Sequence, residues 1–192
     1  MQSLCINFIK FKTTTNHSFV KKTKFLFLIL FFFISIHTYA DKYEADSIYH
    51  SLQRNMEDTL RVKALRDLSV SMYTYSPDSA LQFAYEALFL AKKIKYKRGI
   101  SNSKEIIAVI LTRMGNYNKA LNYYIDNLKL EESMKSDDGI ICAKINIGIV
   151  YTYLLDYNKA LENYLLADSL VNTFHTNDKE YKENLRYSIK LN

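Results

Sequence analysis

Glycine and proline are scarce in this 192-residue sequence, which holds four glycines and one proline. Both residues destabilise helix interiors, glycine through backbone entropy and proline through its missing N–H group. Leucine, alanine, lysine, glutamate and tyrosine are plentiful instead. This balance favours a helical chain.

Cysteine and histidine are too few and too scattered for a disulfide framework or a metal site. Cys5 lies near the amino terminus and Cys142 is the single cysteine after residue 40, so that part of the sequence offers no second cysteine for an intramolecular disulfide. A single thiol on a helix is usually a small buried hydrophobe. The histidines do not occur at ligand spacing from one another or from a cysteine, which argues against bound zinc; they are His17, His37, His50 and His175.

Sequence motifs of catalysis are missing as well. The chain has no glycine-rich phosphate loop, no GxSxG and no HExxH. Its carboxylates are scattered, and Asp137 and Asp138 fall in a loop between predicted repeats. We therefore expect a protein that is not an enzyme and that needs no cofactor or metal.

The positive charge belongs to one end of the chain. The formal net charge is +6, but residues 1–40 hold five lysines and no acidic residue. From residue 41 onward, 21 basic residues face 20 acidic ones. This near balance does not support a nucleic-acid-binding surface.

Residues 1–40 resemble a leader segment. Three lysines at 21, 22 and 24 precede the apolar run of residues 25–36, and a small residue, Ala40, comes just before Asp41. This pattern predicts a signal peptide cleaved after Ala40, and an uncleaved membrane anchor through residues 25–36 is the alternative. The polar residues before Val20 suggest that translation starts at Val20. The predicted location is exported: periplasmic, or attached to the outer side of the cytoplasmic membrane.

A pentapeptide that occurs twice organises the rest of the chain. YNKAL occupies residues 117–121 and again 157–161, and the offset of 40 leads back to Ala80 and Leu81. A fixed period of this size indicates a repeat array. We divide the chain into a capping helix at 41–58, three repeats at 60–99, 100–139 and 140–179, and a closing or truncated helix at 180–192.

Each repeat is predicted to hold two helices. Ser76, Asn116 and Asp156 are placed to cap the second helix of each unit, and Pro77 follows at a first helical position. Gly99 and Gly139 are expected to end units one and two as left-handed caps; they carry no side chain that would strain this conformation.

Small residues recur where the two helices of a unit should approach closely. We expect Ala80, Ala120 and Ala160 to lie opposite Leu68, Ala108 and Gly148, respectively. Tyr124 and Tyr164 should fill the space between neighbouring units.

These positions resemble the tetratricopeptide repeat (TPR) family. Unit three matches the family pattern at Ile147-Gly148, Tyr151, Ala160, Tyr164 and Ala167. Unit two departs at Asn127, and unit one places Asp67 where an apolar residue is usual. The resemblance implies an all-α right-handed superhelix of stacked antiparallel helix pairs. It also implies a peptide-binding groove formed by Met72, Tyr73, Asn102, Glu105, Thr112, Arg113, Thr152 and Tyr153.

The resemblance predicts a non-catalytic scaffold that binds a protein or peptide. The layout is similar to the amino-terminal sensor region of bacterial TPR histidine kinases or TPR helix-turn-helix regulators, with the chain truncated. The alternatives are a self-standing periplasmic adaptor and a membrane-anchored TPR protein. An apolar strip on the helix at 180–192 predicts self-association or fraying at that end.

Two clusters admit a structural or a functional interpretation. The basic cluster at Lys92, Lys93, Lys95, Lys97 and Arg98 is either an anion-binding patch or a solvated helix end, and we favour the latter. The tyrosines at 123, 124, 151 and 153 form either a recognition surface or contacts between repeats, and again we favour the second.

Overall fold

The computed structural model describes residues 46–49, 52, 56–173, 183 and 186. All of them belong to one compact unit, residues 42–192. The predicted leader, its cleavage and start sites, and nearly all of the predicted closing helix at 180–192 lie outside the described residues. Of the predicted capping helix at 41–58, the structure describes residues 46–49, which are helical, together with Leu52 and residues 56–58.

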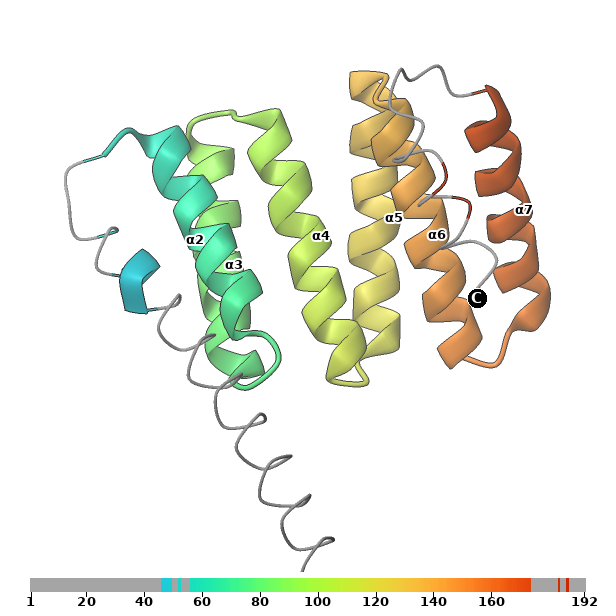
Figure 1. Ribbon diagram of the computed structural model, residues 1–192, viewed down its shortest axis with the longest axis horizontal. Helices are drawn as coiled ribbons and strands as arrows, with labels where there is room; N and C mark the ends of the chain where they lie inside the picture. The colour runs from blue at the N-terminus through green and yellow to red at the C-terminus, as the bar shows by residue number, and fades with distance from the viewer. Residues whose placement is uncertain (1–45, 50–51, 53–55, 174–182, 184–185, 187–192) are drawn as a thin grey trace, which may run out of the picture. The chain divides into compact units, whose positions relative to one another are not determined.

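Six long helices, α2 to α7, follow one another in the described part of the chain, which contains no strand. Each helix packs against its neighbours in sequence, and α2 also contacts α4. Side by side from α2 to α7, the helices form three antiparallel pairs, which confirms the predicted all-α repeat fold (Figure 1). The helices are α2 (Asp58–Met72), α3 (Pro77–Lys93), α4 (Lys97–Arg113), α5 (Tyr117–Met134), α6 (Asp137–Tyr153) and α7 (Tyr157–Thr173).

The period of 40 is visible in the helix starts. The second helices α3, α5 and α7 begin at 77, 117 and 157, and α4 and α6 begin at 97 and 137. The helix pairs thus begin two to three residues before the sequence-based units at 60, 100 and 140.

This earlier start overturns the predicted role of two glycines. Gly99 and Gly139 lie in the first turns of α4 and α6 and do not end α3 and α5. Among the described residues, the left-handed ones are Gly115, with φ of 76°, and three residues with side chains, Lys95, Lys135 and Leu155, with φ of 58°, 54° and 60°. A side chain at Gly99 would clash with the ring of Tyr96, since an added Cβ would lie 2.4 Å from its Cδ1. Close packing therefore explains Gly99, and Gly139 gives room to the Glu131 side chain.

The predicted helix starts agree with the structure, although only one of the capping bonds forms. Ser76 and Asn116 are the N-cap residues of α3 and α5, without a side-chain capping bond. Asp156 Oδ1 accepts a hydrogen bond from the Lys159 backbone N–H at 3.2 Å at the start of α7. Pro77 stands at the beginning of α3, as expected.

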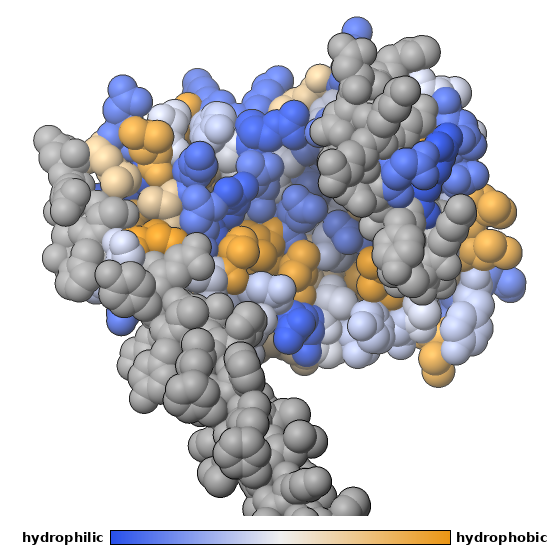
Figure 2. Space-filling model, viewed as in Figure 1, coloured by the Kyte–Doolittle hydropathy of each residue, from blue (hydrophilic) through white to orange (hydrophobic). Residues whose placement is uncertain are grey.

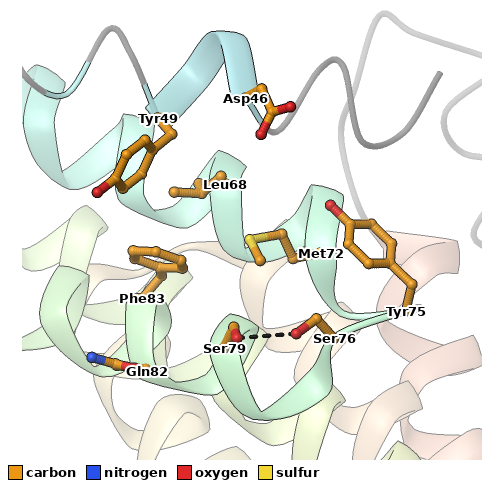
Figure 3. A pocket seen from close by; sticks show the side chains of 9 residues that line it. All are labelled: Asp46, Tyr49, Leu68, Met72, Tyr75, Ser76, Ser79, Gln82 and Phe83. Carbon is orange, nitrogen blue, oxygen red and sulfur yellow. Dashed lines mark hydrogen bonds between the residues drawn. The ribbon is translucent and has the colours of Figure 1, made fainter. Parts of the chain in front are cut away.

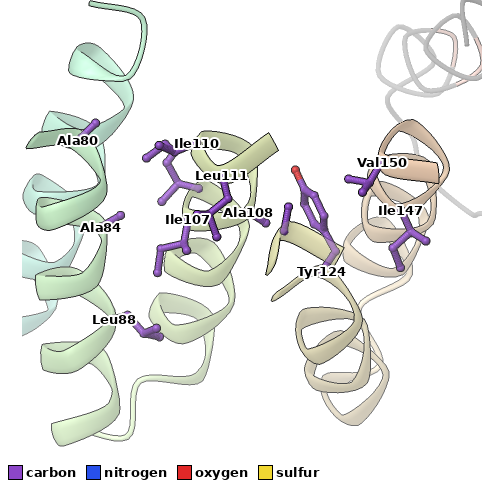
Figure 4. Close-up of a cluster of buried hydrophobic side chains, with 12 residues drawn as sticks. Ala80, Ala84, Leu88, Ile107, Ala108, Ile110, Leu111, Tyr124, Ile147 and Val150 are labelled. Atoms are coloured by element: carbon purple, nitrogen blue, oxygen red, sulfur yellow. The ribbon is translucent and has the colours of Figure 1, made fainter. Parts of the chain in front are cut away.

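The core repeats with the sequence. Each second helix buries four residues on one stripe, spaced four, three and four apart, and the set recurs 40 residues later. In Figure 4 the ring of Tyr124 lies between Ala108 of α4 and Val150 of α6, within one cluster that extends to Ala80. The stripe positions are 80, 84, 87 and 91 in α3, 120, 124, 127 and 131 in α5, and 160, 164, 167 and 171 in α7.

Gly148 packs against an aromatic ring. The three atoms nearest to an added Cβ all belong to the Tyr164 ring, the first at 2.5 Å. Ala80 instead receives a hydrogen bond at its carbonyl from Ser69 Oγ, at 2.7 Å. At Gly148 the nearest side chain is thus a large one, and the pairing of Ala80, Ala120 and Ala160 with Leu68, Ala108 and Gly148 stays a prediction.

Candidate binding site

The first helices of the three pairs present a common face with two hollows. Figure 2 shows hydrophilic residues gathered over the middle of the array in this view. One hollow, here called the α2–α4 hollow, has a volume of about 230 Å³. The second, the α4–α6 pocket, has a volume of about 140 Å³, and Asn102 lines both.

The α4–α6 pocket is polar and rich in carboxylates. Arg98, Asn102 and Glu105 come from α4, and Asp138, Cys142 and Asn146 from α6. Helix α5 adds Tyr124, Asn127 and Glu131 from its buried stripe. Gly139 and Ala143 of α6 complete the lining, and the absence of a side chain at Gly139 leaves room for Glu131.

Glu131 is a buried carboxylate, 2% exposed, held by two residues of α4. Its Oε2 lies 3.3 Å from Arg98 Nη1, and Ser101 Oγ donates a hydrogen bond to its Oε1. Arg98 also reaches Ser136 Oγ at 3.3 Å. Burial of a charge is costly unless it is paired and hydrogen-bonded, and these contacts supply that compensation.

Glu105 has weaker compensation. Burial raises the pKa of its carboxyl, and repulsion from Glu131 raises it further. Arg66, Arg98 and a hydrogen bond from Asn146 act in the opposite direction on this pKa. That bond is long, 3.4 Å from Asn146 Nδ2 to Glu105 Oε1. Glu105 thus retains acceptor capacity facing the pocket.

Two buried polar atoms on this face have no hydrogen-bond partner among the described residues. They are Asn127 Oδ1 in the α4–α6 pocket and Ser103 Oγ in the α2–α4 hollow. Native proteins satisfy nearly all buried polar atoms, so such exceptions require an explanation. The remaining lining of the α2–α4 hollow comprises Val62, Lys63 and Arg66 of α2, with Tyr96, Gly99 and Asn102.

The predicted groove residues divide into two groups. Asn102 and Glu105 line the α4–α6 pocket, as just described. The other six lie at or beside the carboxyl ends of α2, α4 and α6: Met72, Tyr73, Thr112, Arg113, Thr152 and Tyr153.

The second group is mostly engaged in contacts within the array. Arg113 lies over the Tyr73 ring, 5.0 Å from its centroid, which joins units one and two. Tyr153 stacks on Tyr117 with 5.2 Å between ring centroids, joining units two and three. Thr152 Oγ1 lies 3.2 Å from the Tyr164 hydroxyl, inside unit three.

An apolar cavity of about 560 Å³ lies beside α2 and α3, and Met72 lines it. Tyr49 and Phe83 flank one side with ring centroids 6.5 Å apart (Figure 3). Ser76 donates to Ser79 near Tyr75, with 3.0 Å between the two oxygens. Sequence reasoning did not foresee this cavity apart from Met72.

The sequence analysis also missed Glu131 and the role of Asn127. A signal was present in the 40-residue alignment, since Ala87, Asn127 and Ala167 are equivalent, as are Ala91, Glu131 and Val171. A polar residue in unit two replaces an apolar one in both neighbours at each position. Asn127 was noted only as a departure from the repeat pattern.

The basic cluster at residues 92–98 surrounds the turn between α3 and α4. Lys92 and Lys93 lie in the last turn of α3, where cations complement the helix dipole. Arg98 instead pairs with Glu131. Of the four tyrosines, Tyr124 is buried in the core, and Tyr123 packs on Tyr85 with ring centroids 6.3 Å apart.

The described residues contain neither a membrane-spanning helix nor a cluster of metal-binding side chains. No helix among them is both long and apolar enough to cross a bilayer. Within the same residues, no group of three or more His, Cys, Asp or Glu side chains comes together as metal ligands would.

Solved structures of other proteins have a fold similar to that of this chain. No protein-family model matches the chain, and no curated protein matches it. Among solved structures, the TPR domain of Arabidopsis FLU is 23% identical with a TM-score of 0.57, covering 62% of this chain and all of that domain. A Rap protein complexed with Competence and Sporulation Factor is 20% identical with a TM-score of 0.62, covering 73% of this chain and 42% of that protein. BtubC from P. vanneervenii is 15% identical with a TM-score of 0.63, covering 79% of this chain and 63% of that one.

Proposed function

We propose that this chain, whose described helices have the TPR fold, is a non-catalytic scaffold that binds a protein or peptide segment. The segment would lie along the face formed by α2, α4 and α6. The observation that carries the proposal is the pair of polar hollows on this face, which share Asn102.

The geometry suits an extended chain. The two hollows draw side chains from three successive first helices, and each contains a buried polar atom without a partner. Curved stacks of helix pairs present extended binding surfaces of this kind. The Rap protein of similar fold was solved with a bound factor, so the fold carries a partner in that protein.

Peptide display against the full chain tests this proposal. Peptides selected on the purified protein should bind less well to an Asn102→Ala variant, because both hollows lose a shared amide. Asn122→Ala is the matched control, since Asn122 is exposed on α5 and outside both hollows. Selected peptides that bind the two variants equally well would show that this face is not the binding surface.

The finer proposal is that the array is the sensor region of a signalling protein and acts outside the cytoplasm. It is supported by the basic start and apolar run of residues 21–36 and by the small residue Ala40. A periplasmic adaptor and a membrane-anchored protein are the alternatives. Cell fractionation with amino-terminal sequencing tests the location. A chain that starts at Asp41 outside the cytoplasm agrees with cleavage, and an intact leader in the membrane fraction supports the anchor. A chain found in the cytoplasm contradicts the sensor, the adaptor and the anchored protein alike.

A further inference from the structure

The α4–α6 pocket breaks the repeat at positions that are otherwise apolar. Glu105 is equivalent to Leu65 and Ile145, and Glu131 to Ala91 and Val171. These apolar counterparts are buried in units one and three. The same helix pair therefore stacks well without any polar group at either position, and stability does not explain the two carboxylates.

Asn127 completes the departure. Its counterparts Ala87 and Ala167 are fully buried, whereas Asn127 is 4% exposed and holds an amide oxygen without a partner. Asn127 and Glu131 are four residues apart on α5, so they lie on one face of that helix. Glu105 of α4 lines the same pocket.

The lining selects for a cation. The residues that line the pocket include three carboxylates, those of Glu105, Glu131 and Asp138, and one basic group, Arg98. Arg66 of the neighbouring α2–α4 hollow also acts on Glu105. Arg98 is already occupied by Glu131 and Ser136. An anionic ligand would be repelled by these carboxylates, whereas a cation would offer hydrogen to Glu105 and to the Asn127 oxygen.

The size of the pocket fits the head of one side chain. A volume of about 140 Å³ admits an ammonium or guanidinium group and excludes a folded element. Among the described residues, no cluster of metal-binding side chains occurs here or elsewhere, so the pocket lacks the ligand set of a metal ion.

We infer that the α4–α6 pocket binds the cationic head of a lysine or arginine side chain, with Glu105 and Asn127 as its principal acceptors. This inference rests on the proposed function, because the side chain would belong to the bound peptide. Burial and the nearby Glu131 raise the pKa of Glu105, and a bound cation would lower it again.

The test uses the full chain, labelled with ¹⁵N, and three small probes. N-acetyl-arginine methylamide and N-acetyl-lysine methylamide carry the two cations, and N-acetyl-norleucine methylamide is an uncharged probe of similar length. At least one cationic probe should shift the amide signals of Asn127, Gly139 and Asn146 in a saturable manner. The norleucine probe should not.

The neighbouring repeats supply the variants. Glu105→Ile and Asn127→Ala give unit two the residues of unit three, so the fold should persist, as circular dichroism will show. Loss of acceptors that bond a charged group should weaken binding of the cationic probe at least about tenfold. Equal shifts from all three probes, or binding that the double variant retains, would overturn the inference.

Failure of the inference and failure of the proposed function give different results. Display-selected peptides that need Asn102 but contain no required basic residue would refute the cation site and leave the scaffold in place. A cationic probe that binds the pocket, while no peptide depends on Asn102, would support the pocket and refute the proposed face.

Discussion

At the scale of single residues, the close contacts between the two helices of a unit depend on the sizes of the two side chains that face each other. Gly148 leaves space that the Tyr164 ring fills, whereas unit one has Leu68 and Ala84 at the equivalent positions. Each unit therefore pairs a larger side chain with a smaller one where its two helices cross: Leu68 with Ala84, Tyr124 with Ala108, and Tyr164 with Gly148.

Gly148→Ala should destabilise the protein by about 1–3 kcal/mol, since the new methyl group would overlap an aromatic ring in a packed core. A Tyr164→Ala background should remove most of this penalty, because the ring is then absent. Thermal melts of the four proteins measure the coupling. Additive effects of the two substitutions would show that Gly148 is limited by something other than Tyr164.

Glu105 should make stability depend on pH. Its folded-state pKa is raised above an ordinary value near 4.5, so its contribution to stability is full below that pH and is lost as pH rises through the folded-state pKa. Glu105→Gln stays neutral throughout and should melt higher than the natural protein at pH 7, with little difference at pH 4.

Melting temperatures of both proteins across this range provide the measurement. Glu132→Gln is the control, because Glu132 is exposed on α5 and its replacement should not produce a difference in melting temperature that grows with pH. A difference between Glu105→Gln and the natural protein that does not change with pH would contradict the raised pKa.

At the scale of elements, the sequence predicted the second helices better than their ends. The second helices begin directly after Ser76, Asn116 and Asp156, as predicted. The repeated pentapeptide marks the start of α5 and α7, and Pro77 marks the start of α3. The prediction that Gly99 and Gly139 end helices was wrong, because glycine suits a left-handed helix end but here gives room to a neighbouring side chain. Lysine and leucine occupy left-handed positions here, which residue preferences alone do not reveal.

The α4–α6 pocket shows a different limit. Glu105 and Asn102 were identified by resemblance to the family, but Glu131 lies on a second helix whose role was assigned to packing. The pattern of burial was needed to recognise that Asn127 and Glu131 face inward. In a sequence, a polar residue at a core position looks like an isolated departure from the repeat pattern. The structure is needed to show that several such residues line one pocket.

The turn before α7 offers a stabilising substitution. Leu155 has φ of 60° and is exposed, and its equivalent in unit two is Gly115, with φ of 76°. A left-handed conformation costs a side-chain-bearing residue roughly 1 kcal/mol, so Leu155→Gly should raise the free energy of unfolding by up to about that amount. Gly115→Leu should lower it.

Urea unfolding of these two variants gives the free energies. Leu161→Gly serves as a control, because Leu161 is an exposed residue inside α7, where glycine should destabilise by roughly 1 kcal/mol relative to a good helix former. A loss of stability for Leu155→Gly comparable to that of the control would mean that the left-handed turn carries no strain.

At the scale of the whole described array, contacts run between neighbours. Each helix packs on the next, and α2 also on α4. Stability in such arrays is approximately a sum of unit and interface contributions. Local damage should therefore stay local.

Leu65→Ala removes a buried side chain of α2 and should cost about 2–5 kcal/mol. Hydrogen exchange should accelerate strongly in α2 and α3 and much less in α6 and α7. The mirror variant Ile141→Ala should reverse this gradient, because Ile141 is buried in unit three. Uniform acceleration over all helices in both variants would indicate one cooperative block.

The α4–α6 pocket spans the junction of units two and three, because its walls come from α4, α5 and α6. A group that enters it would act as a wedge and set the angle at which the third unit leaves the second. The bound partner would then also change the angle between successive units of the array. Spin labels at the exposed positions Glu86 on α3 and Glu162 on α7 would report this as a change in their separation when the arginine probe is added, and an unchanged separation under saturation would show that the junction is rigid.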